Sequence, residues 1–199
     1  MDELVRDAKR PLEGLTSQQR ENIALLKEKL DLNEHKVRAT LGILGENNIP
    51  LERLIDKLIE IAENFKALQE GWPQTVVVRG VLSKTDPHVF TLNADAQRAI
   101  ERGDLAKADA LLADVKRLEP NAKNAAEASA RRGEIALTRL RYGEAATHFA
   151  SAAAALPKTA YEDQRISYLK KEASALYKQR DELGDNDALL SARSRAPRG

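Results

Sequence analysis

The chain has 199 residues and a formal net charge of +1, from 32 lysines and arginines against 31 aspartates and glutamates. A charge so close to zero gives no long-range attraction to nucleic acid or to an anionic membrane. The absence of cysteine excludes disulfides, thiolate metal sites and a cysteine nucleophile. Aromatic residues make up only 4% of the chain, which argues against a β-sandwich or barrel and favours helices.

The beginning of the chain, MDELVRDAKR, is charged and is not followed by an apolar run of signal-peptide length. No stretch is long and apolar enough to cross a bilayer. We therefore expect a cytoplasmic protein with no membrane partner. Residues 1–15 show little periodicity and are predicted to be weakly ordered.

Residues 16–70 are predicted to form an N-terminal unit of three helices. Ser17 and Asn33 are suited to the N-caps of the first two, and Pro50 to the first position of the third. The third helix has the most regular apolar pattern in the chain. Its stripe has alternating spacings of three and four residues and consists of Leu51, Leu54, Leu58, Ile61, Phe65 and Leu68.

Two interpretations of this stripe remain open. The favoured one is packing within the chain onto the first two helices, because three heptads is close to the minimum that indicates a coiled coil. The other is a self-association seam that makes the protein a homo-oligomer. Residues 71–85, which include Gly71, Pro73 and Gly80, cannot continue a helix and are predicted to be a linker.

From residue 87 onward one spacing occurs twice, at an offset of 37 residues. Successive intervals of 12, 4, 3 and 5 residues separate Ala96, Ala108, Leu112, Val115 and Pro120, and again Gly133, Ala145, Phe149, Ala152 and Pro157. Such a spacing places a small residue of one helix against a small residue of the next, with a large apolar residue one turn later. Because one antiparallel pair cannot bury both of its faces, the pairs are expected to stack.

These residues resemble the tetratricopeptide repeat family, although the large aromatic residues usual in its first helix are replaced by Leu92 and Ser129, and by Ala99 and Ala136. The resemblance implies an all-α, right-handed solenoid of antiparallel helix pairs that follows the N-terminal unit. Two repeats are expected at about 89–122 and 126–159, with an incomplete third at 161–195 whose first helix covers 161–182. It also implies that the chain is a piece of a larger bacterial protein containing such repeats.

No catalytic constellation is present, and the three histidines are scattered along the chain, so we expect no enzyme, metal or cofactor. Residues 24–41 have the outline of a helix-turn-helix, in which Lys36 and Arg38 would contact DNA. However, residues 1–70 hold 11 basic and 14 acidic residues, a balance that opposes phosphate binding. A nucleic-acid-binding regulator is therefore the least favoured function.

In the family that the repeats resemble, the first helix of each pair lines a concave surface that holds peptides. Carried over position by position, that surface would consist of Asn93, Gln97, Ile100, Glu101, Ala130, Glu134, Leu137 and Thr138. This lining is mixed in polarity, which is typical of a protein partner. We therefore expect a non-catalytic scaffold or sensor that binds a peptide or protein, with self-assembly through residues 50–70 as the alternative.

Overall fold

The computed structural model describes residues 34–47, 49, 53–70, 87–157 and 160–183. Within these ranges the regular structure is entirely helical, which confirms the expected all-α class. The predicted first helix of the N-terminal unit, the linker at 71–85 and the residues after Leu183 lie outside the described residues. None of the described helices combines the length and the apolar character needed to span a membrane.

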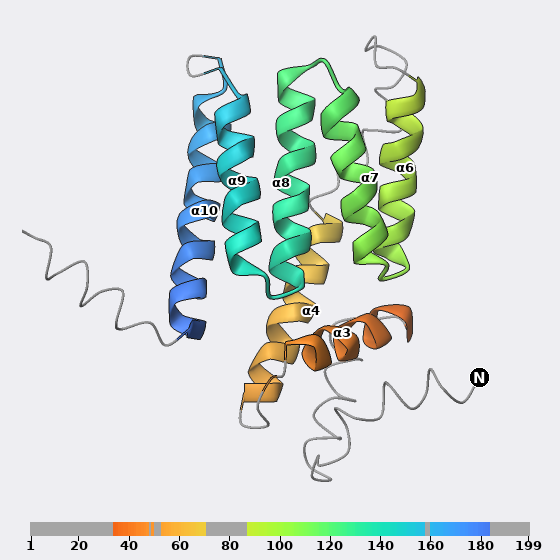
Figure 1. Ribbon diagram of the computed structural model, residues 1–199, viewed down its shortest axis with the longest axis vertical. Helices are drawn as coiled ribbons and strands as arrows, with labels where there is room; N and C mark the ends of the chain where they lie inside the picture. Colours follow the sequence, from red (N-terminus) through yellow and green to blue (C-terminus); the bar gives the residue numbers. More distant parts are fainter. Residues whose placement is uncertain (1–33, 48, 50–52, 71–86, 158–159, 184–199) are drawn as a thin grey trace, which may run out of the picture.

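Among the described residues, two helices lie before residue 71 and five lie after residue 86. They are α3 (Glu34–Glu46), α4 (Leu54–Glu70), α6 (Pro87–Glu101), α7 (Leu105–Leu118), α8 (Ala122–Thr138), α9 (Tyr142–Ala155) and α10 (Glu162–Leu183). The last five stand side by side in chain order, each packed on its neighbour (Figure 1). Local signals fix their ends: Asp104 and Asn121 cap the N-termini of α7 and α8, and Pro120 and Pro157 follow the C-caps of α7 and α9.

The turns inside the α6–α7 and α8–α9 pairs have the same backbone structure at an offset of 37 residues. Gly103 and Leu140 both adopt left-handed conformations, with φ of 74° and 58°. In each turn the left-handed N–H donates to the carbonyl three residues back and the next N–H donates five residues back, as in a Schellman motif. Leu140 holds a conformation that costs a non-glycine residue about 1 kcal/mol, while its side chain is buried in the core.

The repeated spacing marks the contacts between paired helices. Ala96, Ala108 and Leu112 are fully buried between α6 and α7, and Phe149 is fully buried at the equivalent place in the second pair. A Cβ atom on Gly133 would lie only 2.7 Å from Cε1 of the Phe149 ring. The large residue of the pattern therefore packs on the small residue of the facing helix.

Helix α4 packs against α8 and completes the core of the repeats, while α3 packs on α4. One continuous cluster of buried side chains includes residues from α3, α4, α6, α7, α8 and α9. Helix α3 also approaches the α6–α7 turn, where a Cβ on Gly103 would lie 3.0 Å from the His35 carbonyl oxygen. The N-terminal helices thus share this core cluster with the repeats, and a second cluster of buried side chains joins α8, α9 and α10.

The apolar stripe of the third predicted helix lies inside this core. Leu58, Ile61, Phe65 and Leu68 are all buried within one chain. Leu51 and the side chain of Leu54 lie outside the described residues. The helices that cover the stripe include those of the repeats, whereas the sequence pointed only to the first two helices of the N-terminal unit or to a second copy.

Candidate functional site

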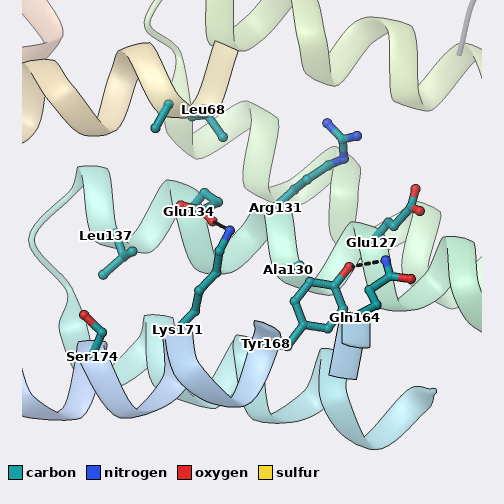
Figure 2. Close-up of a pocket in the computed structure, with 11 residues that line it drawn as sticks. Leu68, Glu127, Ala130, Arg131, Glu134, Leu137, Gln164, Tyr168, Lys171 and Ser174 are labelled. Atoms are coloured by element: carbon teal, nitrogen blue, oxygen red, sulfur yellow. Dashed lines mark hydrogen bonds and ion pairs between the residues drawn. The ribbon is translucent and has the colours of Figure 1, made fainter. Parts of the chain in front are cut away.

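A pocket of about 480 Å³ opens between α4, α8 and α10 (Figure 2). Its lining residues are Ala67, Leu68, Glu127, Ala130, Arg131, Glu134, Leu137, Gln164, Tyr168, Lys171 and Ser174. The volume is within the range of about 300–1,000 Å³ that is usual for ligand pockets. Three helices that are far apart in the sequence therefore build one concave site.

The pocket combines an apolar base with polar groups at fixed positions. Ala130, Leu137 and Leu68 contribute the apolar surface. The hydroxyl oxygen of Tyr168 accepts a hydrogen bond of 2.8 Å from Nε2 of Gln164, one helical turn earlier. This arrangement leaves the Tyr168 proton free to be donated into the pocket.

An ion pair joins the two long walls of the pocket. Nζ of Lys171 on α10 donates to the Glu134 carboxylate on α8 (Figure 2). Nζ of Lys171 also lies 5.7 Å from the centre of the buried Phe149 ring, within the range of a cation–π contact. The pair is accessible to solvent and its opening would widen the pocket at little cost.

Burial alters the titration of two further lining groups. It lowers the pKa of Arg131 below its ordinary value, while the nearby Glu127 carboxylate acts in the opposite direction. Burial also raises the pKa of Tyr168, against the hydrogen bond from Gln164, so this hydroxyl stays protonated at neutral pH. The pocket thus offers a guanidinium, a neutral hydroxyl, an amide and carboxylates around an apolar base.

The eight residues expected to line the peptide surface are not gathered into one site. Ala130, Glu134 and Leu137 of α8 line the pocket, but Thr138 is buried and its hydroxyl donates to the Glu134 carbonyl at 2.8 Å. Ile100 of α6 belongs to the core.

The other three expected residues of α6 also lie outside the pocket. Asn93 donates to the Val89 carbonyl, and Gln97 donates to Glu101. The wall made by α10, including Tyr168 and Lys171, was not anticipated, because no local pattern links that helix to α8.

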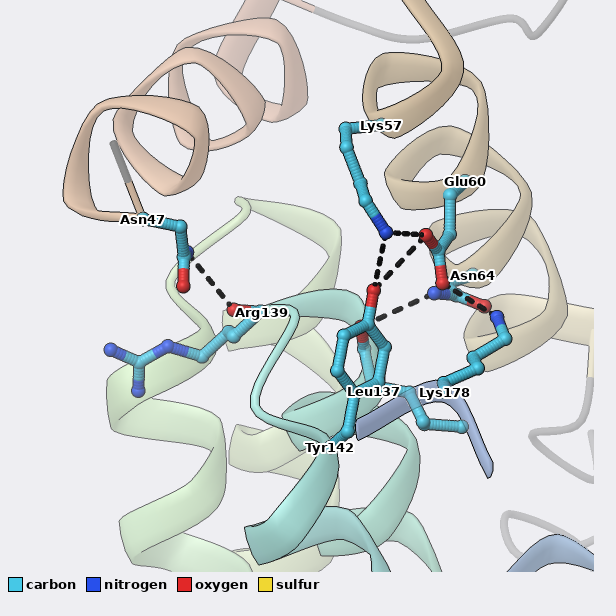
Figure 3. A network of polar contacts seen from close by, with 8 residues as sticks. All are labelled: Asn47, Lys57, Glu60, Asn64, Leu137, Arg139, Tyr142 and Lys178. Carbon is cyan, nitrogen blue, oxygen red and sulfur yellow. Dashed lines mark hydrogen bonds and ion pairs between the residues drawn. The ribbon is translucent and has the colours of Figure 1, made fainter. Parts of the chain in front are cut away.

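A polar network fixes α4 beside the pocket (Figure 3). The Glu60 carboxylate accepts from Nζ of Lys57 at 2.7 Å, from Nζ of Lys178 at 2.5 Å and from the Tyr142 hydroxyl at 3.1 Å. Lys57 also donates to the Tyr142 hydroxyl at 2.9 Å, and only 6% of its side chain is exposed. One carboxylate therefore ties α4 to both α9 and α10.

The environment of Glu60 determines the direction of its pKa shift. Burial alone would raise the pKa, but the hydrogen bonds and charges of Lys178 and Lys57 outweigh it and hold the pKa below 4.5. Nearby, Nδ2 of Asn64 donates to the Leu137 carbonyl at 3.2 Å, and Nδ2 of Asn47 donates to that of Arg139 at 3.3 Å. Both contacts link the N-terminal helices to the end of α8.

The other classes of site have little support in the part of the chain that the structure describes. No group of three or more histidines and carboxylates there could hold a metal ion. Lys36, expected at the DNA in the helix-turn-helix reading, is buried and donates to Oε1 of Gln69 at 2.8 Å. The side chain of Arg38 and residues 24–33 lie outside the described residues.

Comparisons of the chain with models of known protein families, with curated proteins and with solved structures found no match.

Proposed function

We propose that this chain is a protein-interaction module without catalysis of its own, and that its pocket binds a short peptide segment of a partner protein. In this proposal the pairs α6–α7 and α8–α9, together with α10, form a right-handed solenoid like that of tetratricopeptide repeats. Support comes from the sequence spacing that occurs twice and places a large residue of one helix on a small residue of the next. The equivalent turns at Gly103 and Leu140 also support it. Such a module would suit a cytoplasmic scaffold or sensor protein of bacteria that contains further repeats.

The observation that carries the proposal is the composition of the pocket. Its apolar base suits one or two aliphatic side chains, and the Tyr168 hydroxyl and Gln164 amide can pair with a peptide backbone. Lys171 pairs with Glu134 and Arg131 interacts with the charge of Glu127, so two cations and two anions of the lining balance. A ligand with alternating polar and apolar groups and little net charge matches this lining best.

The extent of the site limits the length of the ligand. Helix α4 packs on α8 and closes one side of the concave surface, so a long peptide cannot lie along the whole array. A segment of a few residues fills about 480 Å³ and can meet both the α8 and the α10 wall. We therefore expect modest affinity, with a dissociation constant on the order of micromolar, as is common for small interaction sites.

The test is a selection of displayed random peptides on the full chain, followed by measurement of their affinity by fluorescence anisotropy. Ala67 is an exposed lining residue, so Ala67→Trp should fill the pocket and weaken selected peptides at least tenfold. Ala154→Trp places the same side chain on an exposed position of α9 that does not line the pocket, and should leave affinity unchanged. Peptides that bind both variants equally, or a selection that enriches none, would reject the proposal.

A further inference from the structure

Helix α10 ends the described array and presents an apolar face to solvent. Four of the six large hydrophobic side chains that are exposed in the described residues belong to it: Ile166 (38%), Leu169 (40%), Leu176 (48%) and Tyr177 (62%). Tyr168 and Ala175, which directly precede Leu169 and Leu176, are buried in the core shared with α9. The exposed apolar side chains therefore lie on a different side of α10 from the residues that pack on α9. A contiguous apolar face of this kind commonly marks an association surface.

The exposed face has the regular spacing of a coiled-coil seam. Intervals of 4, 3, 4, 3 and 4 residues separate Glu162, Ile166, Leu169, Ala173, Leu176 and Arg180. Alternation of three and four keeps all six positions on one stripe of the helix. We call these six positions the α10 stripe. Its two ends carry opposite charges and its middle is apolar, so the stripe is complementary to itself when it is reversed.

We propose that the α10 stripe pairs with the same stripe of a second copy of this chain in an antiparallel arrangement. Reversal about residue 171 places Ile166 opposite Leu176 of the other copy and Leu169 opposite the small Ala173. It also places Glu162 opposite Arg180, so each end of the pair is closed by opposite charges. A self-complementary surface of this kind generates a closed dimer with two-fold symmetry.

Two charged residues meet their own copies near the axis of this dimer. Lys170 and Glu172 flank the α10 stripe on opposite sides, at its solvent-accessible rim. Like charges at a rim cost little, because solvent and salt screen them. Arg165, two turns earlier on the same flank as Glu172, supplies a counter-charge. The like-charge contacts are therefore expected to weaken the dimer without preventing it.

The size of the α10 stripe sets the expected strength of association. A helix of 22 residues is about 33 Å long, so one helix pair is smaller than a standard interface of about 1,600 Å². We expect a reversible dimer with a dissociation constant of roughly 1–100 micromolar. The pocket is lined from another face of α10, by residues such as Lys171 and Ser174, and stays accessible in the dimer.

The first test is solution mass by sedimentation equilibrium on the full chain between micromolar and millimolar concentrations. The mass should rise from monomer to dimer, and Leu169→Glu should keep it at monomer. Ser167→Glu adds the same charge to an exposed position of α10 outside the α10 stripe and should leave dimerisation unchanged. Circular dichroism checks that each variant is folded. A chain that is monomeric throughout, or a dimer that survives Leu169→Glu, overturns the proposal.

The second test examines whether the two helices pair in the antiparallel register. Arg180→Glu alone and Glu162→Arg alone should each weaken the dimer severalfold, and the double variant should restore it. Because the chain has no cysteine, Lys170→Cys should form a disulfide-linked dimer on oxidation, whereas Ser167→Cys should not. Failure of the charge exchange to restore the dimer overturns the register.

If removal of residues 185–199 turns a monomer into a dimer, the end of this chain covers the face instead, and the proposal fails.

Discussion

Gly133 shows how a single small residue sets the distance between α8 and α9. It lies inside a helix, where glycine lowers stability by about 0.5–1 kcal/mol relative to alanine. The fully buried Phe149 ring occupies the space that a side chain at Gly133 would need, with three ring atoms within 2.9 Å of an ideal Cβ. The packing requirement therefore overrides helix propensity at this position.

This conflict predicts that two glycine-to-alanine substitutions change the free energy of unfolding in opposite directions. Gly133→Ala should destabilise the protein, because overpacking costs about 1–3 kcal/mol and exceeds the gain in helix propensity. Gly42→Ala in α3 should stabilise it by about 0.5–1 kcal/mol, since nothing lies within 4 Å of a Cβ there. Urea unfolding monitored by circular dichroism measures both. An increase in stability for both variants would show that Phe149 can move away freely.

At the scale of a single helix, the main feature is the position in which α4 packs on α8. Its apolar face alone could slide along the repeats, because hydrophobic contacts are not directional. The contacts of Glu60 with Lys57, Tyr142 and Lys178 define one position, since a carboxylate with three donors tolerates little displacement. Because Ala67 and Leu68 of α4 line the pocket, the shape of the pocket depends on the position of this helix.

Replacement of Glu60 should change the free energy of unfolding by an amount that depends on pH, because the contacts of Glu60 require its charge. Because the folded-state pKa of Glu60 lies below 4.5, the ionised carboxylate stabilises the fold above pH 4.5, and this contribution is lost as the pH falls through the folded value. Glu60→Gln should cost about 1–3 kcal/mol at pH 7 and progressively less as the pH falls through the folded-state pKa of Glu60. Glu63→Gln, at an exposed position of the same helix, is the control. A cost for Glu60→Gln that does not change with pH would contradict the role of its charge.

At the scale of the whole molecule, the N-terminal helices and the repeats behave as one unit because they share a core. The cluster that contains Ile61 and Phe65 of α4 also contains Val89 of α6, Leu112 of α7 and Ile135 of α8. Removal of α3 and α4 would expose the apolar surface of the repeats to water. The repeats are therefore not expected to fold independently of these two helices.

A shared core predicts a single unfolding transition. Phe65→Ala should lower the stability of the whole molecule by about 3–5 kcal/mol, because it leaves a cavity at a fully buried site. Circular dichroism and the exchange of amide hydrogens in α8 should report the same lowered midpoint. Lys66→Ala, at the exposed neighbouring position, should change it by less than about 0.5 kcal/mol. Separate transitions for α4 and α8 would mean that the two parts fold independently.

Local patterns in the sequence were sufficient to predict several features of the fold. Apolar periodicity indicated helices at α3, α4 and α6 to α10, and the 37-residue offset located the contact of Gly133 with Phe149. These features depend on residues within one or two neighbouring helices, so their size and spacing carry the information. The left-handed residue of the second turn was less visible, because Leu140 occupies the place where the first turn has Gly103.

The candidate site was only partly predictable. Positions carried over from a repeat family pointed to Ala130, Glu134 and Leu137, which do line the pocket, but also to Ile100 and to residues of α6 that lie elsewhere. The missing wall comes from Tyr168 and Lys171 of α10. Neither residue stands out in the sequence, because an isolated tyrosine or lysine on a polar helix has no local signature.

The sequence by itself determined that this protein is helical, where most of its helices lie and how the paired helices approach one another, because helix periodicity and side-chain volume act over short distances. Only the tertiary structure decided what covers the stripe of α4, since an apolar face looks the same whether its partner is in the same chain or in another. The contacts that settle the question, such as those of Glu60 with Tyr142 and Lys178, join residues that are 82 and 118 positions apart. Packing over such separations depends on the three-dimensional arrangement of all the helices together.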